Sequence, residues 1–373
     1  MNSRFHIYLV LAASVSALAT DMIVPAIPDI QKGFDVPYTY VQLLISGFLI
    51  IYALSQLAAG FIGEKLGKLK VLTWSFLIFT AGSLTCFLAK DVNGLFIGRL
   101  IQALGAGAGP VLSRALAKDN FPEESLKKTL SDISSASAVV PLIAPLLGGF
   151  LLGYLNWNFI FLFMFIFGIG TVLLTPRELT SHKIEAETSS ESFVTPSFIT
   201  GTVLVSLMLS SLFCFISLSP GLFIGELKLS PLAFSFVFSA SVLFFIIGNQ
   251  LSKISFFEKP LFLFIINALT AIPFLLSINN IAIYLISLVI YNVTLGIYYP
   301  SAWFLSLKIK GNKTGIASAI TGFTQTVSAG AVSLIFVSLE GSHFSFDKIL
   351  GFSIFIMASV SLLVCVYKRK FNE

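Results

Sequence analysis

The sequence predicts an all-α membrane protein with twelve transmembrane helices, arranged as two six-helix pseudo-repeats. Three observations lead to this fold class. The mean hydropathy is +0.93, only 11% of the 373 residues are charged, and the basic residues gather in alternate breaks between long apolar runs. That alternation is the positive-inside pattern of a helical protein that crosses the membrane many times. It predicts that both termini lie in the cytoplasm.

The breaks between the apolar runs form two sets. The basic set carries Lys65, Lys68, Lys70, Arg114, Lys118, Lys127, Lys128, Arg177, Lys183, Lys253, Lys259, Lys308, Lys310, Lys313, Lys368, Arg369 and Lys370. The other set has only Lys32, Lys90, Lys228 and Lys348 as its cations. The net charge of +5 therefore lies along one membrane face, where it sets orientation and contacts anionic lipid headgroups. We expect no binding of nucleic acid.

Twelve apolar runs have the length of roughly 17–25 residues that a helix needs to cross the hydrocarbon. Periodicity cannot distinguish strand from helix in such saturated runs, so their length decides. A transmembrane barrel would instead alternate within segments of about ten residues. The runs are 5–26, 40–62, 71–89, 94–115, 130–153, 157–175, 198–219, 231–251, 261–279, 281–305, 314–338 and 348–367.

One long polar stretch, 176–196, divides the chain into equal sets of runs. We expect an N-terminal half over 1–175, a cytoplasmic linker over 176–196 and a C-terminal half over 197–373. The halves echo each other faintly, since Gly105 and Pro110 match Gly296 and Pro300 at similar offsets. Two parallel six-helix repeats predict a central cavity where they meet.

Two charged residues lie more than one helical turn inside predicted membrane spans. Asp21 lies near the outer end of the first span, and Arg99 lies in the fourth. Charged residues within a membrane normally face a cavity and mark the path of an ion or substrate. An interfacial cap at Asp21 and a snorkelling Arg99 are the alternatives. Arg99 needs a carboxylate, an amide or helix-end carbonyls as its partner, and Gln102 lies one turn further on the same face.

Other polar or aromatic side chains in the spans are candidates for lining a substrate cavity, or for joining helices to each other. They are Gln102, Tyr52, Gln56, Asn249, Tyr291, Asn292, Tyr298 and Gln325.

Two further segments are candidates for conformational change. After the second span, a glycine-rich basic loop permits a tight reversal, and its residues are Gly60, Glu64, Lys65, Gly67 and Lys68. In the fifth span, two prolines free backbone carbonyls and bend the helix, and two glycines allow close packing. We call these residues, Pro141, Pro145, Gly148 and Gly149, the gate cluster.

These segments resemble the major facilitator superfamily, and within it the twelve-span drug:proton antiporters of the Bcr/CflA type. The loop over 60–70 is similar to the signature G-x-L-x-D-R-x-G-R-K, with Glu64 at the acidic position. The segment from Arg99 to Gly107 resembles R-x-x-Q-G-x-G, with Ala103 where glycine is usual. Segment 141–149 resembles the antiporter motif, and 21–28 resembles the Bcr/CflA branch.

The resemblance implies a proton-coupled secondary transporter that exports small amphipathic compounds across the bacterial inner membrane by alternating access. It implies that Asp21 and Arg99 couple protons to export. We therefore expect no enzymatic activity, cofactor or metal, with the proton gradient as the energy source. We expect a monomer whose partners are a small-molecule substrate, protons and membrane lipid. The alternatives are a dedicated transporter of one metabolite, such as a carboxylate siderophore, and a membrane sensor without transport.

Overall fold

The computed structural model describes residues 3–176, 194–252, 260–306, 308, 314–340 and 344–371. Over these residues the regular structure is helical, apart from an isolated bridge between Glu340 and Phe344. In the same residues, eight helical stretches are long and apolar enough to cross a membrane, and three shorter apolar helices accompany them. A helix lies in each of the twelve predicted runs. The predicted all-helical fold is therefore confirmed.

The chain divides into two compact units. Unit 1 comprises Met1–Val36 and Leu43–Ala186, and unit 2 comprises Pro37–Gln42 and Glu187–Glu373. Most of the predicted linker over 176–196 lies outside the described residues. The six residues Pro37–Gln42, at the start of α3 (Tyr38–Leu66), therefore pack with unit 2.

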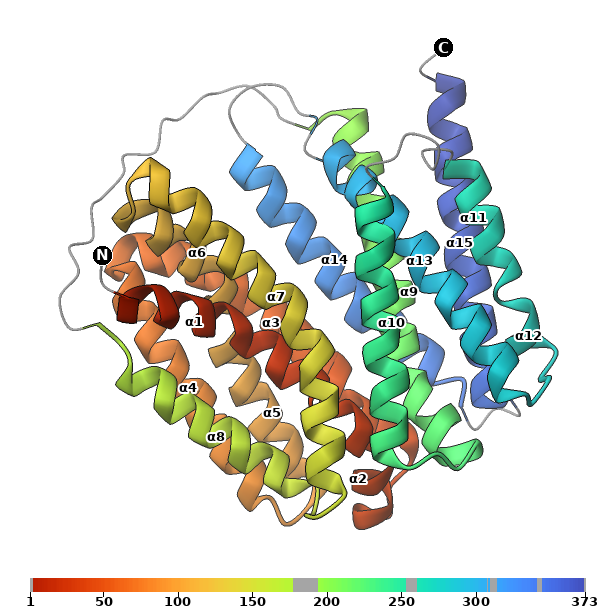
Figure 1. The fold of residues 1–373 in the computed structure, drawn as a ribbon, viewed down its shortest axis with the longest axis horizontal. Coiled ribbons are helices and arrows are strands. Elements are labelled where there is room, and N and C mark those ends of the chain that lie inside the picture. The colour runs from red at the N-terminus through yellow and green to blue at the C-terminus, as the bar shows by residue number, and fades with distance from the viewer. Residues whose placement is uncertain are drawn as a thin grey trace. The chain divides into compact units, whose positions relative to one another are not determined.

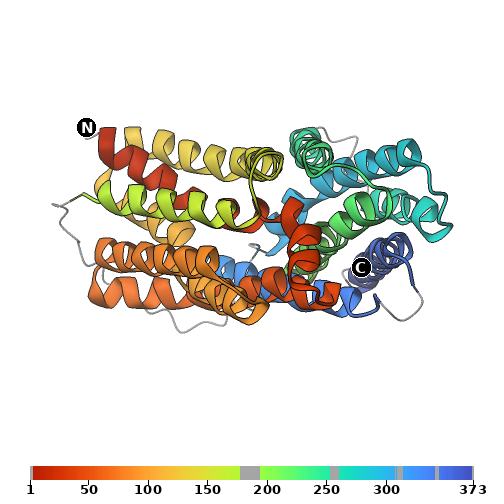
Figure 2. The same ribbon diagram turned by 90° about the horizontal axis from the view of Figure 1, so that it is seen from below.

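Unit 1 is a bundle in which α1 packs against α6 and α7, while α4 packs against α5 and α8. These helices run side by side in the view of Figure 1 and again when the molecule is turned (Figure 2). Apolar residues form long helices here because hydrocarbon leaves the backbone no other hydrogen-bond partners. The elements are α1 (Ser3–Asp21), η1 (Val24–Ala26), α2 (Ile27–Phe34), α3 (Tyr38–Leu66), α4 (Lys68–Leu88), α5 (Val92–Ala106), α6 (Ala108–Asn120), α7 (Glu123–Leu152) and α8 (Asn158–Leu173).

Unit 2 repeats this packing order with its own helices. Its first helix, α9, packs against α13, α14 and α15, and α11 packs against α13 and α15. The recurrence supports two six-helix repeats, which the glycine and proline offsets in the sequence indicated only faintly. The elements are α9 (Pro196–Pro220), η2 (Gly221–Glu226), α10 (Pro231–Leu251), α11 (Pro260–Leu269), α12 (Ile272–Leu275), α13 (Ile281–Ser306), α14 (Thr314–Val337) and α15 (Phe346–Phe371).

The first turn of α3 belongs to unit 2 because its side chains bind the end of α9. The hydroxyl of Tyr38 donates to the carbonyl oxygen of Ser217 at 2.7 Å and accepts from the backbone N–H of Gly221 at 3.1 Å. Gln42 donates its Nε2 to the same Ser217 carbonyl at 2.5 Å. The Tyr38 hydroxyl thus lies between two groups that an α-helix would join directly. At this point α9 gives way to the π-helical turn η2.

Two predicted spans are interrupted. The run over 5–26 ends as an α-helix at Asp21, and the chain continues through the 3₁₀ turn η1. The run over 261–279 is split between α11 and α12. Pro25 and Pro273 stand at the starts of the new elements, as expected for residues that cannot donate to a preceding turn.

Candidate functional site

Asp21 is the last residue of α1, and its side chain is buried. The residue is 7% exposed, and it has no hydrogen bond or ion pair with any residue that the structure describes. A charge without a partner is costly to bury, so this carboxyl differs from the interfacial cap considered from the sequence. Its place at the break between α1 and η1 agrees with the prediction that it lies near the end of the first span.

Arg99 lies on α5 and is fully buried. Its Nε donates to the carbonyl oxygen of Leu44 at 3.1 Å, and its Nη1 donates to the carbonyl oxygen of Ala19 at 2.9 Å. Nη1 also donates to Oε1 of Gln102 at 2.6 Å. The guanidinium carbon stands 4.1 Å from the centre of the Phe48 ring. Nη2 has no hydrogen-bond partner among the described residues. The snorkelling alternative therefore does not hold.

The structure does not pair Arg99 with Asp21. Of the kinds of partner considered from the sequence, Arg99 takes backbone carbonyls and a side-chain amide instead of a carboxylate. The last carbonyls of a helix lack partners within the helix and carry its negative dipole end. Since α1 ends at Asp21, the carbonyl of Ala19 is such a group, and it accepts a hydrogen bond from Nη1 of Arg99. Arg99 thus binds the end of α1 by a backbone carbonyl.

Gln102 faces Arg99, as the sequence spacing predicted. Its Nε2 donates onward to Oγ of Ser83 at 2.8 Å and contacts Sδ of Met164 at 3.3 Å. The chain of hydrogen bonds from Arg99 through Gln102 joins α5 to α4 and α8. Because Gln102 is fully buried, it connects helices in this conformation. Ser83 and Met164 could not be identified from the sequence, since serine and methionine are ordinary residues of apolar spans.

Tyr52 and Gln56 meet on one face of α3. Nε2 of Gln56 donates to the Tyr52 hydroxyl at 2.7 Å, and the Tyr52 ring stacks on Phe48 with 6.0 Å between ring centres. Because Phe48 also lies under Arg99, Phe48, Tyr52 and Gln56 form a continuous row of side chains that leads from the guanidinium along α3. Phe48 escaped sequence analysis because it is one of 38 phenylalanines.

The candidates in unit 2 separate into smaller groups. The Tyr291 hydroxyl and Oγ of Ser211 lie 2.7 Å apart. Asn292 donates its Nδ2 to the carbonyl oxygen of Leu288 at 2.8 Å, while its Oδ1 is buried without a partner. Both residues are buried within the unit. The Tyr291 contact joins α13 to α9, whereas the hydrogen bond of Asn292 stays within α13.

Three further candidates of unit 2 are partly exposed: Asn249, Tyr298 and Gln325. The hydroxyl of Tyr299, which sequence analysis missed, donates to Oε1 of Gln325 at 3.0 Å. The ring of Tyr298 packs edge-on against Phe264, with 4.7 Å between centres. The pair of Tyr299 and the candidate Gln325 therefore joins α13 to α14.

The predicted basic loop is shorter than expected. Gly60 and Lys65 lie within α3, Lys68 begins α4, and the reversal takes the single residue Gly67, whose φ is +97°. That conformation favours glycine, and it lets both helices run to the turn. The side chain of Glu64 lies outside the described residues. Lys65 is exposed.

Lys68 instead forms a buried ion pair at the base of unit 1. Its Nζ lies 2.8 Å from Oδ2 of Asp119 on α6, and the two side chains are 7% and 3% exposed. Removal of one partner from such a pair leaves an uncompensated charge. The pair fixes the start of α4 to the end of α6, which the sequence spacing could not reveal.

The gate cluster lies in a continuous helix. Pro141 and Pro145 are inside α7, which runs without interruption over Glu123–Leu152. The two prolines therefore do not interrupt the fifth span. Gly148 faces the end of α1: a Cβ atom there would come within 2.1 Å of the carbonyl oxygen of Met22, the residue after Asp21. Gly149 is also buried.

The family model of the Major Facilitator Superfamily matches residues 9–334. The chain belongs to this superfamily. It is thus a membrane transporter of the secondary type and not an enzyme.

A relative agrees with this membership, and a solved transporter structure shares the fold. The chain is 29% identical to the uncharacterized MFS-type transporter YdgK of Bacillus subtilis over 87% of its own length and 86% of that protein. It is 30% identical to Multidrug resistance protein D of Escherichia coli, over 42% of the chain and 40% of that protein. The fold matches an inward-facing bacterial homologue of the human lysosomal transporter Spinster with a TM-score of 0.76, at 13% identity, covering 98% and 95% of the two chains.

Replacing Gly148 by leucine is expected to reduce flux through this superfamily transporter at least about tenfold. Because the nearest atom is backbone, α7 must move away from the end of α1 to admit a side chain. Membrane abundance should stay near that of the wild type, as measured by immunoblot. Gly170→Leu is the matched control, since nothing lies within 4 Å of a Cβ atom there. Wild-type flux in Gly148→Leu would contradict a role for the gate cluster.

Proposed function

We propose that the chain is a proton-coupled antiporter of the Bcr/CflA type that exports small amphipathic compounds, including drugs, by alternating access. The proton gradient supplies the energy, and no cofactor takes part. The transporter works as a monomer in the bacterial inner membrane, with both termini in the cytoplasm. Its partners are the exported compound, protons and membrane lipid.

The observation that carries this proposal is the buried carboxyl of Asp21 at the end of α1, which has no partner among the described residues. Proton coupling requires a group that is stable without charge in one conformation and exchanges its proton in another. A carboxyl in apolar surroundings meets the first condition as the neutral acid. Asp21 stands at the break between α1 and η1. Breaks in membrane helices occur where a cavity or packed protein satisfies the freed backbone groups, and a cavity at this break would let Asp21 exchange its proton, which is the second condition.

The substrate class draws support from the relatives. One of them bears the name Multidrug resistance protein D, although the match covers less than half of that protein. Tyr52 and Gln56, which are partly exposed on α3, offer an aromatic ring beside hydrogen-bonding groups. Such a combination suits compounds that are apolar with one polar end.

The test is transport by purified protein in liposomes, with ethidium and tetraphenylphosphonium as probes. An imposed pH gradient should drive probe movement against its concentration gradient, and nigericin should abolish it by collapsing the pH gradient. Vesicles without protein are the control. Probe binding without gradient-driven movement would contradict the proposal and favour a sensor.

A second candidate function is the transport of one anionic metabolite. The observation that favours it is Nη2 of Arg99, a buried cationic donor without a partner. Arginine presents a planar fork that matches a carboxylate. Under this alternative, the protein in liposomes would move labelled citrate and would not move the cationic probes, and citrate movement would fall in Arg99→Lys.

A further inference from the structure

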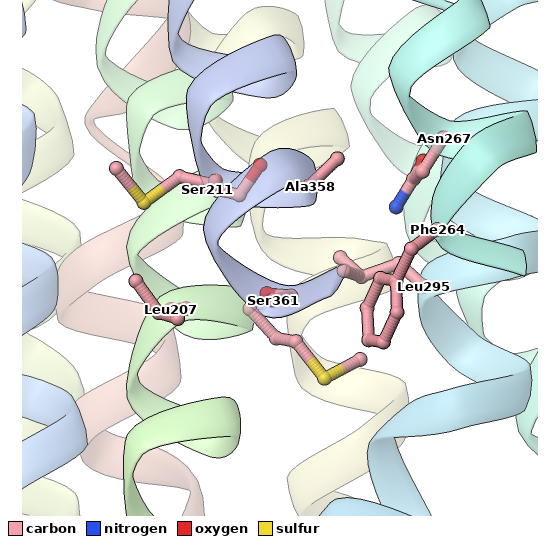
Figure 3. Close-up of a pocket in the computed structure, with 9 residues that line it drawn as sticks. Leu207, Ser211, Phe264, Asn267, Leu295, Ala358 and Ser361 are labelled. Atoms are coloured by element: carbon pink, nitrogen blue, oxygen red, sulfur yellow. The ribbon is translucent and has the colours of Figure 1, made fainter. Parts of the chain in front are cut away.

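A small cavity lies inside unit 2 where α9, α11, α13 and α15 meet (Figure 3). Its volume is about 10 Å³, which is room for one water molecule. Apolar side chains such as Phe264 and Leu295 form much of its wall, and three polar side chains interrupt them: Ser211, Asn267 and Ser361. A purely apolar cavity of this size would stay dry, so these polar groups decide what it holds.

Two of the polar groups have no partner in the part of the chain that the structure describes. Asn267 is 5% exposed; its Oδ1 accepts from Oγ1 of Thr294 at 3.1 Å, whereas its Nδ2 makes no hydrogen bond. Figure 3 shows the amide nitrogen turned toward the cavity. Ser361 is 2% exposed, and its hydroxyl also makes no hydrogen bond. The third group, Ser211, is bound to the hydroxyl of Tyr291.

Buried amides and hydroxyls in proteins almost always have a hydrogen-bond partner, and ordered water supplies it where the protein does not. Here one donor, from Asn267, and a hydroxyl that can donate or accept, from Ser361, line the same space. A buried water molecule typically makes two to four hydrogen bonds to such groups. The cavity offers that number when Ser211 is included.

We propose that this cavity is a binding site for a single water molecule. The water accepts a hydrogen bond from Nδ2 of Asn267 and bonds to the hydroxyl of Ser361, with Ser211 as a further partner. It thereby joins α11 to α15 and α9 at a place where Asn267, Ser361 and Ser211 form no hydrogen bond with one another in the described structure.

The position of the site in the fold gives the water a structural role. Asn267 lies in the last turn of α11, just before the break that separates α11 from α12. The break is held locally by Oγ1 of Thr270, which donates to the Asn267 carbonyl oxygen at 2.6 Å. A membrane helix can be interrupted only where nearby groups satisfy the polar atoms that the break leaves. The water adds a hydrogen-bond acceptor for the side-chain amide of Asn267, next to the break.

The direct test is a structure of the wild-type protein at about 2 Å resolution by crystallography or electron microscopy. We expect one compact density peak within hydrogen-bonding distance of both Asn267 Nδ2 and Ser361 Oγ. An empty cavity would overturn the proposal, and so would elongated density of the kind that a lipid chain gives.

A double-mutant cycle on melting temperature provides a second, independent test. Asn267→Leu and Ser361→Ala each remove one partner of the water, so the second substitution should lower the melting temperature less than it does in the wild type. The matched control is Ser353→Ala, because the hydroxyl of Ser353 on the same helix is satisfied by the carbonyl of Leu350 at 2.8 Å. Its effect should simply add to that of Asn267→Leu. Additive effects of Asn267→Leu and Ser361→Ala would contradict a shared water, as would a higher melting temperature in Ser361→Ala. If Asn267→Leu fails to fold, the density measurement on the wild type still decides.

Discussion

Arg99→Ala is expected to abolish gradient-driven transport and to lower the free energy of unfolding by roughly 2–4 kcal/mol. The substitution leaves the carbonyl oxygens of Ala19 and Leu44 and Oε1 of Gln102 without the donor that they share. It also removes the cation from the face of Phe48. The end of α1 then loses its attachment to α5, so the carboxyl of Asp21 is no longer held in place. Thermal melting in detergent and flux in liposomes measure the two effects.

Two further variants separate the charge of Arg99 from its shape. Arg99→Lys keeps the charge but has no planar fork, so it can serve only part of the acceptor set. We expect intermediate flux and stability. Arg114→Ala is the control, since Arg114 is an exposed arginine whose Nη1 binds the carbonyl of Pro110 one turn away. Wild-type melting and flux in Arg99→Ala would rule out the role assigned to Arg99.

The sequence predicts the fold because membrane helices are specified by length and hydropathy, which are properties of single segments. It also predicts the contact of Arg99 with Gln102, since residues three apart on a helix share a face. Predictions within one helix depend only on the helical repeat. Such predictions therefore do not require knowledge of how the helices pack.

Contacts between helices were predicted poorly, because they depend on which surfaces meet. The sequence leaves a carboxylate, an amide and helix-end carbonyls open as partners of Arg99, and only the structure reveals where α1 ends and that the Ala19 carbonyl accepts from Arg99. Lys68 was assigned to a basic loop, but it pairs with Asp119, about fifty residues later. Asn267 gave no signal, since a single amide in an apolar run is as consistent with packing as with binding.

The first turn of α3 shows the same difficulty at the level of domains. A polar linker marks the division of the chain, and composition alone assigns everything before it to the first half. Tyr38 and Gln42 nevertheless bind the carbonyl of Ser217 and so pack with unit 2. Nothing in their composition distinguishes them from the tyrosine and glutamine further along α3 that remain in unit 1.

Asp21→Asn is expected to abolish transport driven by a pH gradient while leaving substrate exchange without a gradient at a measurable rate. Asparagine keeps the shape of the side chain but cannot bind and release a proton. Because Asp21 makes no hydrogen bond or ion pair with the described residues, the exchange removes no contact. Stability should therefore change little. The decisive measurement is probe-induced proton release in detergent, followed with a pH indicator, for the wild type and the variant.

Asp35→Asn is the matched control for this experiment, since it makes the same chemical change in an exposed carboxyl. Asp35 has a φ of +50°, a conformation that asparagine adopts readily, so the backbone should not respond. Proton release should be lost in Asp21→Asn and retained in Asp35→Asn. If both variants release protons and export the probe like the wild type, coupling lies elsewhere. Asp132 is then the next candidate, since its Oδ2 lies 3.0 Å from Nε2 of His6, and loss of proton release in Asp132→Asn alone would establish it.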